Sequence, residues 1–218
     1  MADAQAGRVR GPYRNGIKRR QDIIASAAKV FGEYGYAGGS LRQVAKRVGV
    51  TPAALTRHFP DKESLLVAVL QYWDSENDRL MPRDLHGIAR VKQMPESARH
   101  HTHDRGLVEM FLTISAEASN PVHPLHDFVQ RRYDRVLSAM IVELTWARDA
   151  GEVLPTLTDE HIVRDVKAAY ALMDGIQLQW LLNPDWDLVS AFRAALGHFI
   201  EVWTGAPVTW DDAKVVEF

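Results

Sequence analysis

Hydrophobic residues recur every three or four positions along most of this chain of 218 residues. The first such pattern places Ile24, Ala27, Phe31 and Tyr34 on one face of a helix over residues 17–36. This spacing is typical of amphipathic α-helices, whereas a half-buried strand alternates apolar and polar residues. No segment of note shows that alternation, so the pattern predicts an all-α fold. The same spacing predicts further helices over residues 61–81, 85–94, 107–119, 125–150, 159–182 and 188–204.

One stretch beginning at Ser40, SLRQVAKRVGVTPAALTRHFPDK, predicts two short helices joined by a tight turn. Ser40 is a favoured N-cap residue, and Gly49 stands where a helix end needs a left-handed backbone. Thr51 can cap the second helix, and Pro52 suits its first position because a missing N–H costs nothing there. Pro60 ends that helix after residue 59. Two helices joined in this way form the helix-turn-helix motif, whose second helix can enter the DNA major groove.

The outward-facing positions of this stretch are rich in hydrogen-bond donors, and Asp61 is its only acidic residue. An ordinary pair of packed helices would show the same short apolar pattern, so the polar face is what favours DNA binding. The donors are Arg42, Gln43, Lys46, Arg47, Thr56, Arg57, His58 and Lys62.

Charge is distributed unevenly between the two parts of the chain. Residues 1–62 contain 12 Lys and Arg against 4 Asp and Glu, a net charge of +8, whereas residues 63–218 contain 14 against 24, a net charge of −10. This split indicates a polyanion-binding N-terminal part attached to an acidic body that avoids the polyanion. Residues 1–16 lack apolar periodicity and are predicted to form a disordered basic arm, which either follows a DNA groove or aids solubility.

The segment from Gln21 to Leu66 resembles the DNA-binding domain of the TetR family of transcriptional regulators. The resemblance rests on a helix ending in FxxxGY, followed by SLRQVAKRVGVTPAALTRHFPDKESLL. Two later strings, EASNPVHPLHDFVQRRYDR and LMDGIQLQWLLNPD, resemble the C-terminal regulatory domain of one broad subgroup of that family. The resemblance implies a three-helix helix-turn-helix domain over residues 17–62, a larger helical ligand-binding and dimerisation domain over 63–205, and a C-terminal tail over 206–218.

The resemblance also implies which residues contact double-stranded DNA. Arg42 and Arg57 have the chemistry to read guanine edges and Gln43 to read adenine, whereas His58 and Lys62 suit phosphates. A phosphate role for any of these side chains stays open. The implied contacts are Ser40, Arg42, Gln43, Thr51, Pro52, Ala53, Thr56, Arg57, His58 and Lys62.

Two of these positions depart from the family pattern. The family usually has Tyr where this chain has Thr56, and often Gly where it has Ala53. Thr56 can donate to a phosphate but lacks an aromatic ring to pack against the DNA backbone, so an unusual base preference is expected.

The family further implies a homodimer, in which the last two long helices, over residues 159–182 and 187–204, form a four-helix bundle with the second subunit. Both segments carry apolar residues on more than one face, which suits an internal core and a partner. The implied function is repression, relieved when a small effector releases the protein from a palindromic operator, although activation stays open.

The effector is expected between helices of the acidic body, and the aromatic and Met content there predicts a largely apolar or amphipathic ligand. Each candidate has an alternative role in packing the core. Gln177 is the most informative, because an amide on an otherwise apolar helix needs a partner, such as a ligand, or Gln179 and the other subunit. The candidate lining residues are Trp73, Met110, Phe111, Ile114, Tyr133, Trp146, Met173, Gln177 and Trp180.

Histidines form two groups, His100, His101 and His103 in one and His123 and His126 in the other. A metal site would need ligands spaced to converge, and a polar loop between helices is the better interpretation of both. A histidine-metal enzyme and a ligand-independent DNA-organising protein are therefore alternatives. Because the sequence contains no GxSxG, HExxH or phosphate-cradling loop, we expect no enzyme activity, no cofactor and no metal.

The chain has no cysteine, which excludes disulfides and thiolate sites. Its N-terminus lacks the apolar run of a secretory signal, and no apolar stretch approaches the roughly 20 residues that cross a membrane. These features predict a cytoplasmic protein without a membrane partner.

Overall fold

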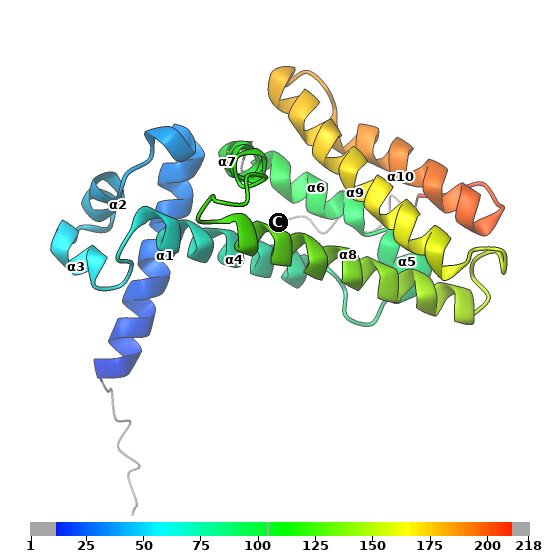
Figure 1. The fold of residues 1–218 in the computed structure, drawn as a ribbon, viewed down its shortest axis with the longest axis horizontal. Coiled ribbons are helices and arrows are strands. Elements are labelled where there is room, and N and C mark those ends of the chain that lie inside the picture. The colour runs from blue at the N-terminus through cyan, green and yellow to red at the C-terminus, as the bar shows by residue number, and fades with distance from the viewer. Residues whose placement is uncertain (1–11, 104, 211–218) are drawn as a thin grey trace, which may run out of the picture. The chain divides into compact units, whose positions relative to one another are not determined.

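A computed structural model describes residues 12–103 and 105–210, and this part of the chain folds into helices without any strand (Figure 1). The prediction of an all-α fold is confirmed. Most of the predicted arm and the end of the predicted tail lie outside the described residues. The helices are α1 (Pro12–Gly38), α2 (Leu41–Val48), α3 (Pro52–Thr56), α4 (Lys62–Leu80), α5 (Gly87–Val91), α6 (Met94–His103), α7 (Arg105–Glu117), α8 (His126–Asp149), α9 (Asp159–Leu182) and α10 (Leu188–Thr204).

Contacts divide the chain into two compact units, one ending at Tyr72 and the other beginning at Trp73. The N-terminal unit thus contains α1 to α3 and the first half of α4. The sequence-based boundary at residue 62 follows the motif instead, and it stays a prediction. The core of this unit consists of side chains that are almost fully buried, namely Ile23, Phe31, Val44, Leu55, Phe59, Leu65 and Leu66.

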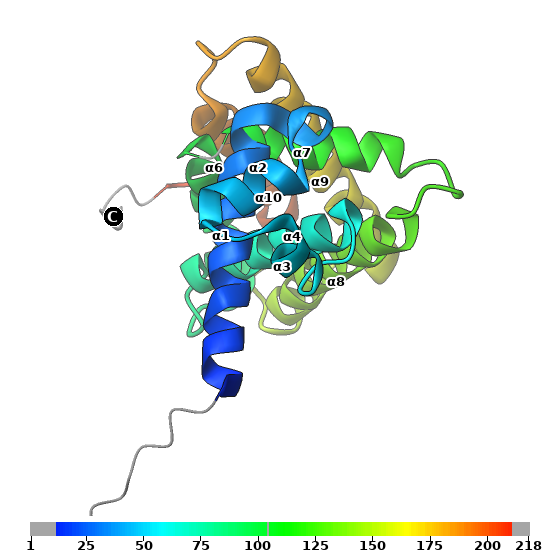
Figure 2. The same cartoon turned by 90° about the vertical axis from the view of Figure 1, so that its left-hand side faces the viewer.

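Helix α1 begins at Pro12, five residues before the predicted start at 17, so residues 12–16 are helical and do not belong to a disordered arm. Figure 2 shows the N-terminal part of α1 extending past α2 and α3. The helix is kinked at Gly35, whose φ of 66° lies in the left-handed region that favours glycine. At Gly39 an added Cβ would lie 2.5 Å from Cδ1 of Phe31, so only glycine fits there.

Helix α3 ends at Thr56, three residues earlier than the predicted end at 59. The N–H groups of His58 and Phe59 both donate to the carbonyl of Leu55, at 2.9 and 3.0 Å, and close the last turn. A residue before proline disfavours the helical region, so Phe59 leaves the helix before Pro60.

The second unit contains the rest of α4 and helices α5 to α10. Helix α9 packs against α7, α8 and α10, while α6 packs against α7 and α10 and α5 against α8. Trp203 on α10 is fully buried, and its Nε1 donates to Asp165 Oδ2 on α9 at 3.0 Å. None of the helices in the described part of the chain combines the length and the apolar character that crossing a membrane requires.

The prediction of one short helix over residues 85–94 followed by a polar loop is wrong. The structure has two helices there, α5 and α6, and Pro95 lies in the first turn of α6. Proline is tolerated in a first turn because its missing N–H has no intrahelical partner. The three histidines from 100 to 103 therefore lie on a helix.

Candidate functional site

The two short helices of the motif are held by caps that the sequence indicated. Ser40 Oγ accepts a hydrogen bond from the Gln43 N–H at 3.3 Å and donates to Gln43 Oε1 at 2.7 Å, so its hydroxyl caps the start of α2. Gly49 ends α2 with a φ of 72°. Thr51 Oγ1 accepts from the Ala54 N–H at 3.1 Å, and Pro52 occupies the first turn of α3.

Most side chains with a predicted role at DNA face solvent. Those of Arg42, Thr51, Pro52, Ala53, Thr56 and Arg57 are exposed, and those of Ser40, Gln43, His58 and Lys62 are half-buried. Exposure fits DNA contact, and each role stays a prediction. Two of these side chains already have partners: Gln43 belongs to the cap, and the Thr56 hydroxyl donates to the carbonyl of Ala53 at 3.1 Å. Thr56 can accept hydrogen bonds as it stands, but it would have to give up this bond to donate to a phosphate.

Some basic side chains near the motif already have partners within the protein. Arg47 forms an ion pair with Glu33 at 2.6 Å, which ties α2 to α1 and offsets its charge. The guanidinium of Arg20 lies 4.7 Å from the ring centroid of Phe59, and the ammonium of Lys62 lies 5.9 Å from that of Phe31. These stacked cations cover core aromatics and keep positive charge at the surface of the unit.

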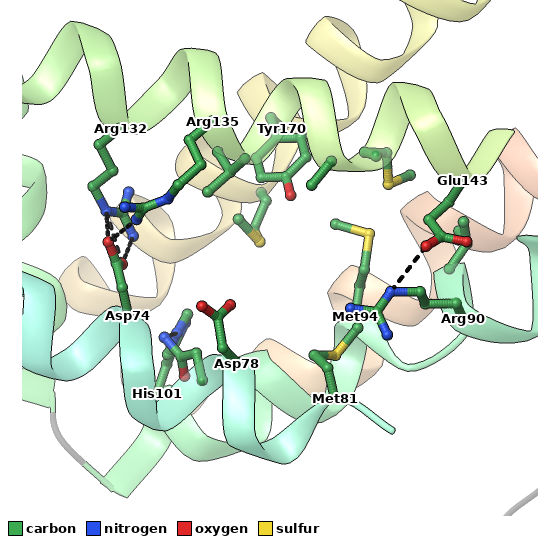
Figure 3. A pocket seen from close by; sticks show the side chains of 16 residues that line it. Asp74, Asp78, Met81, Arg90, Met94, His101, Arg132, Arg135, Glu143 and Tyr170 are labelled. Carbon is green, nitrogen blue, oxygen red and sulfur yellow. Dashed lines mark hydrogen bonds and ion pairs between the residues drawn. The ribbon is translucent and has the colours of Figure 1, made fainter. Parts of the chain in front are cut away.

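The second unit contains a cavity of about 180 Å³, drawn in Figure 3. Side chains from α4, α5, α6, α8 and α9 line it, together with Met81 just after α4. Its walls combine apolar side chains with a set of charged ones. The apolar members are Met81, Val91, Met94, Val136, Ala139, Met140 and Met173.

At one end of the cavity, Asp74 on α4 holds two arginines from α8 (Figure 3). Arg132 Nε donates to Asp74 Oδ1 at 2.9 Å, and Arg135 Nη2 donates to Asp74 Oδ2. The side chains of Asp74 and Arg132 are 10% and 11% exposed, and the Arg132 guanidinium lies 4.0 Å from the ring centroid of Phe111. Burial of both charges makes their pairing a structural requirement of the unit.

At the other end, Glu143 on α8 receives groups from the segment around α5. Arg90 Nε lies 3.3 Å from Glu143 Oε1, and the Gly87 N–H donates to Glu143 Oε2 at 3.0 Å. His86 Nδ1 lies 3.4 Å from the same carboxylate. This cluster fixes the short helix α5 against α8.

His101 is buried between two amides, one from α4 and one from α9. Its Nε2 lies 3.2 Å from Asn77 Nδ2, and its Nδ1 lies 2.9 Å from Gln177 Nε2. Burial lowers the pKa of His101 to about 3, with a smaller contribution from the charge of Arg132, so the ring is neutral near pH 7. A neutral imidazole accepts at one nitrogen and donates at the other, so one of the two amides must turn its oxygen toward the ring.

Gln177 therefore has one partner within the chain, His101. The expectation of a polar loop at His100, His101 and His103 is wrong, because these residues lie on α6 and the two amides compensate the burial of His101. His123 and His126 have backbone partners: the Leu125 N–H donates to His123 Nδ1 at 3.2 Å, and His126 Nδ1 lies 2.8 Å from the Ala118 carbonyl. Among the described residues, no three His, Cys, Asp or Glu side chains are placed to hold a metal ion.

A smaller cavity of about 40 Å³ adjoins His101 and contains five of the nine candidate ligand residues, namely Trp73, Phe111, Tyr133, Met173 and Gln177. Met173 lines the larger cavity as well. The Tyr133 hydroxyl donates to Asp174 Oδ2 at 2.6 Å, and burial raises the pKa of Asp174 above its ordinary value.

The other four candidates line neither cavity. Met110 and Ile114 are fully buried core residues, Trp180 packs under the Arg105 guanidinium at 5.4 Å, and Trp146 is 44% exposed. A ligand role for all nine stays a prediction.

Sequence reasoning missed the charged and polar residues of the larger cavity, which include Asp74, Asp78, Arg132 and Tyr170. One signal could have found some of them. Asp74 and Asp78 are four residues apart on one helix that is largely apolar in its first half, so they share one face of it. A pair of acids on one face of such a helix points to buried partners or a ligand.

Comparisons with known proteins agree with this architecture. Residues 23–69 match the model of the bacterial regulatory proteins of the tetR family. The chain is 41% identical to the transcriptional repressor AcnR of Corynebacterium diphtheriae over 51 residues, which cover 23% of this chain and 27% of AcnR. It is 25% identical to the transcriptional regulator UidR of Escherichia coli K12 over 189 residues, which cover 83% of this chain and 92% of UidR.

A similar fold occurs in the solved complex of SmeT with triclosan. The TM-score is 0.71 at 21% identity, covering 89% of this chain and 98% of SmeT. A capped helix-turn-helix followed by a helical unit with an internal cavity defines a class of DNA-binding transcriptional regulators. Within that class, the match over residues 23–69 and the shared fold support the TetR family for this chain.

Proposed function

We propose that this protein is a sequence-specific transcriptional repressor that acts in the cytoplasm as a homodimer and leaves a palindromic operator when a small molecule binds. The observation that carries the proposal is α4, a single helix that begins with Lys62 at the helix-turn-helix and contributes Asp74, Asn77 and Asp78 to the cavity. One helix thus contains residues of both candidate sites.

The DNA-binding part of the proposal rests on the exposed donors of α2 and α3. In this proposal Arg42 and Arg57 read guanine edges, while His58 and Lys62 hold phosphates. Gln43 can read adenine only if its amide leaves the cap with Ser40.

The dimer part rests on apolar side chains of the last two long helices that face solvent in the single chain. Leu172, Leu178 and Leu182 on α9 are 44, 52 and 78% exposed, and Val202 on α10 is 54% exposed. Large apolar side chains gathered on neighbouring helices are typical of a subunit interface. A dimer also matches the motif, because the two half-sites of a palindrome need two DNA-binding domains.

The release mechanism follows as a population shift. An effector that binds one conformation of the body more tightly favours that conformation. Helix α4 then moves the two DNA-binding domains of the dimer out of half-site spacing. An effector with equal affinity for both conformations would change nothing. Structures of the dimer with and without effector should therefore differ in the distance between the two DNA-binding domains, and equal distances would exclude this mechanism.

The test of the proposed function is selection of random duplex DNA on the purified protein at near-physiological salt. We expect a palindromic site that Arg57→Ala binds at least tenfold more weakly, because a bidentate base contact of about 1–3 kcal/mol is lost in each of the two half-sites. Arg131→Ala is the matched control, since that arginine is 72% exposed on α8. Recovery of no consensus would favour the DNA-organising alternative.

A further inference from the structure

Within the cavity, most charged side chains are already paired with one another. Asp74 holds Arg132 and Arg135, and Glu143 holds Arg90, which also donates to the Pro82 carbonyl at 2.7 Å. Arg135 is 57% exposed, so solvent screens the positive charge that Asp74 leaves unbalanced. The arginines of the cavity are therefore poorly available for an anionic ligand.

Asp78 is the exception among these charges. Its carboxylate lines the cavity one helical turn after Asp74, on a residue that is exposed to solvent, and it makes no hydrogen bond or ion pair with any residue that the structure describes. Figure 3 shows Asp78 pointing into the space between α4 and α8. A hydrated carboxylate at the mouth of a cavity, with no cation of the protein bound to it, favours a ligand that donates hydrogen bonds and carries positive charge.

Tyr170 on α9 faces Asp78 across the cavity (Figure 3). Burial raises the pKa of Tyr170 to about 12, so its hydroxyl stays protonated and neutral near pH 7. That hydroxyl has no hydrogen-bond partner in the described ranges, and it can accept from a ligand N–H. The phenol ring also presents a π face that attracts a cation.

Asn77 adds a third acceptor beside Asp78. When Gln177 is the amide that turns its oxygen to His101, Asn77 donates to Nε2 of that ring. The buried Asn77 Oδ1, which lacks a hydrogen-bond partner among residues 12–103 and 105–210, then remains for a ligand. Leaving such an oxygen unpaired costs about 1–3 kcal/mol, so a ligand donor there would be favourable.

The rest of the cavity suits a short apolar group. Met81, Met94, Met140 and Met173 form much of its wall, and thioether side chains adapt to irregular ligands. A volume of about 180 Å³ accommodates on the order of a dozen waters, and hence a similar number of ligand atoms.

We propose that this cavity binds a small organic cation, a protonated primary or secondary amine with a short apolar body, whose ammonium group lies among Asp78, Tyr170 and Asn77. The proposal rests on the proposed function, because it names the chemical class of the effector. Of the two kinds of ligand that the sequence predicts, apolar or amphipathic, it selects the amphipathic one.

The experiment compares hexylamine, hexanol and hexanoate, which share one apolar chain, by titration calorimetry on the full chain at pH 7. We expect hexylamine to bind at least tenfold more tightly than hexanol, and hexanoate to bind most weakly. Asp78→Asn should lower the hexylamine affinity about tenfold and leave hexanol unchanged. The matched control Asp84→Asn removes an equal charge from an exposed loop and should bind all three like the wild type.

Hexyltrimethylammonium, which keeps the charge but has no N–H donor, should bind several-fold more weakly than hexylamine. Equal binding of that probe would overturn recognition through N–H donors. The cation class is overturned if hexanol or hexanoate matches hexylamine, if Asp78→Asn has no effect on hexylamine, or if hexylamine shows no saturable binding at millimolar concentration.

Failure of the proposed function would look different. In that case the DNA selection yields no palindrome, or hexylamine binds without changing operator affinity, while the preference for the amine and its dependence on Asp78 persist.

Discussion

At the scale of single residues, the body of this protein depends on buried polar groups that hold one another. Burial of the His101 ring is tolerated because amides from two other helices lie within hydrogen-bond distance of both ring nitrogens. Burial of the Asp74 carboxylate is tolerated because it forms ion pairs with two arginines of α8. Removing one member of either group leaves the others buried without a partner, which costs more than the contact itself contributes.

The low pKa of His101 predicts a specific pH dependence of stability. The folded state resists protonation down to a pKa of about 3, whereas the unfolded state takes up the proton near 6.5, so stability is lost as pH falls below 6.5. Between pH 7 and 5.5 we expect this residue to reduce the unfolding free energy by about 1 kcal/mol. Urea unfolding at both pH values measures the loss, and His101→Gln should show a smaller one. An equal loss in both proteins would contradict the assignment.

Asp74→Asn should destabilise the body by about 3 kcal/mol, because Arg132 would keep a buried charge with no carboxylate to balance it. Asp127→Asn provides the control, since Asp127 is 77% exposed and lies 3.9 Å from Arg131 in a surface pair. Such pairs contribute about 0–1 kcal/mol. Chemical denaturation of both variants measures the difference, and similar midpoints would refute the role given to Asp74.

At the scale of elements, the sequence predicted a helix well where its ends carry their own signals. Thr158 caps α9 by accepting from the His161 N–H, and Asp187 caps α10 by accepting from the Val189 and Ser190 N–H groups. Gly205, with a φ of 70°, ends α10. These signals lie within a few residues of the helix ends, so the predicted bounds of both helices match the structure.

Elements and site residues that depend on distant partners were harder to predict. The histidines of α6 were expected in a polar loop. The amides that compensate the burial of His101 are 24 and 76 residues away in the sequence, so no local pattern indicates them. The charged wall of the cavity was missed for the same reason, since Asp74 and Arg132 are separated by 58 residues. Local patterns in a sequence do not reveal such pairs.

The junction between α1 and α2 gives an element-scale prediction. Gly39→Ala should destabilise the N-terminal unit by about 1–3 kcal/mol, because the new Cβ would overlap the buried ring of Phe31. Gly32→Ala is the control, since an added Cβ there meets nothing within 4 Å and alanine favours a helix. Thermal unfolding should show a lower midpoint for the first variant only, and a lower midpoint for both would point to a general intolerance of substitution.

At the scale of the whole molecule, the proposed dimer unites two single-chain features, the DNA-reading motif and the exposed apolar side chains of α9 and α10. In a two-fold interface, each substituted residue acts on both subunits, so a single charge is introduced twice. Disruption of this interface should weaken operator binding even though every DNA contact in each chain is intact.

Leu178→Glu should therefore convert the dimer to a monomer at micromolar concentration and lower operator affinity at least tenfold. Val142→Glu is the matched control, because Val142 is 64% exposed on α8, away from the proposed interface helices. Size-exclusion chromatography with light scattering gives the mass of each variant. A dimeric Leu178→Glu beside a monomeric Val142→Glu would move the interface to α8.

The spacing of Asp74 and Asp78 on α4 also has a consequence for how this regulator can evolve. One of the two acids is fixed by the fold, because two arginines depend on it, whereas the other has no partner to lose. A codon change at position 78 can therefore alter the charge offered to an effector while the helix stays anchored one turn away. A lineage of such proteins could acquire a new inducer by single substitutions there, without first compensating a loss of stability.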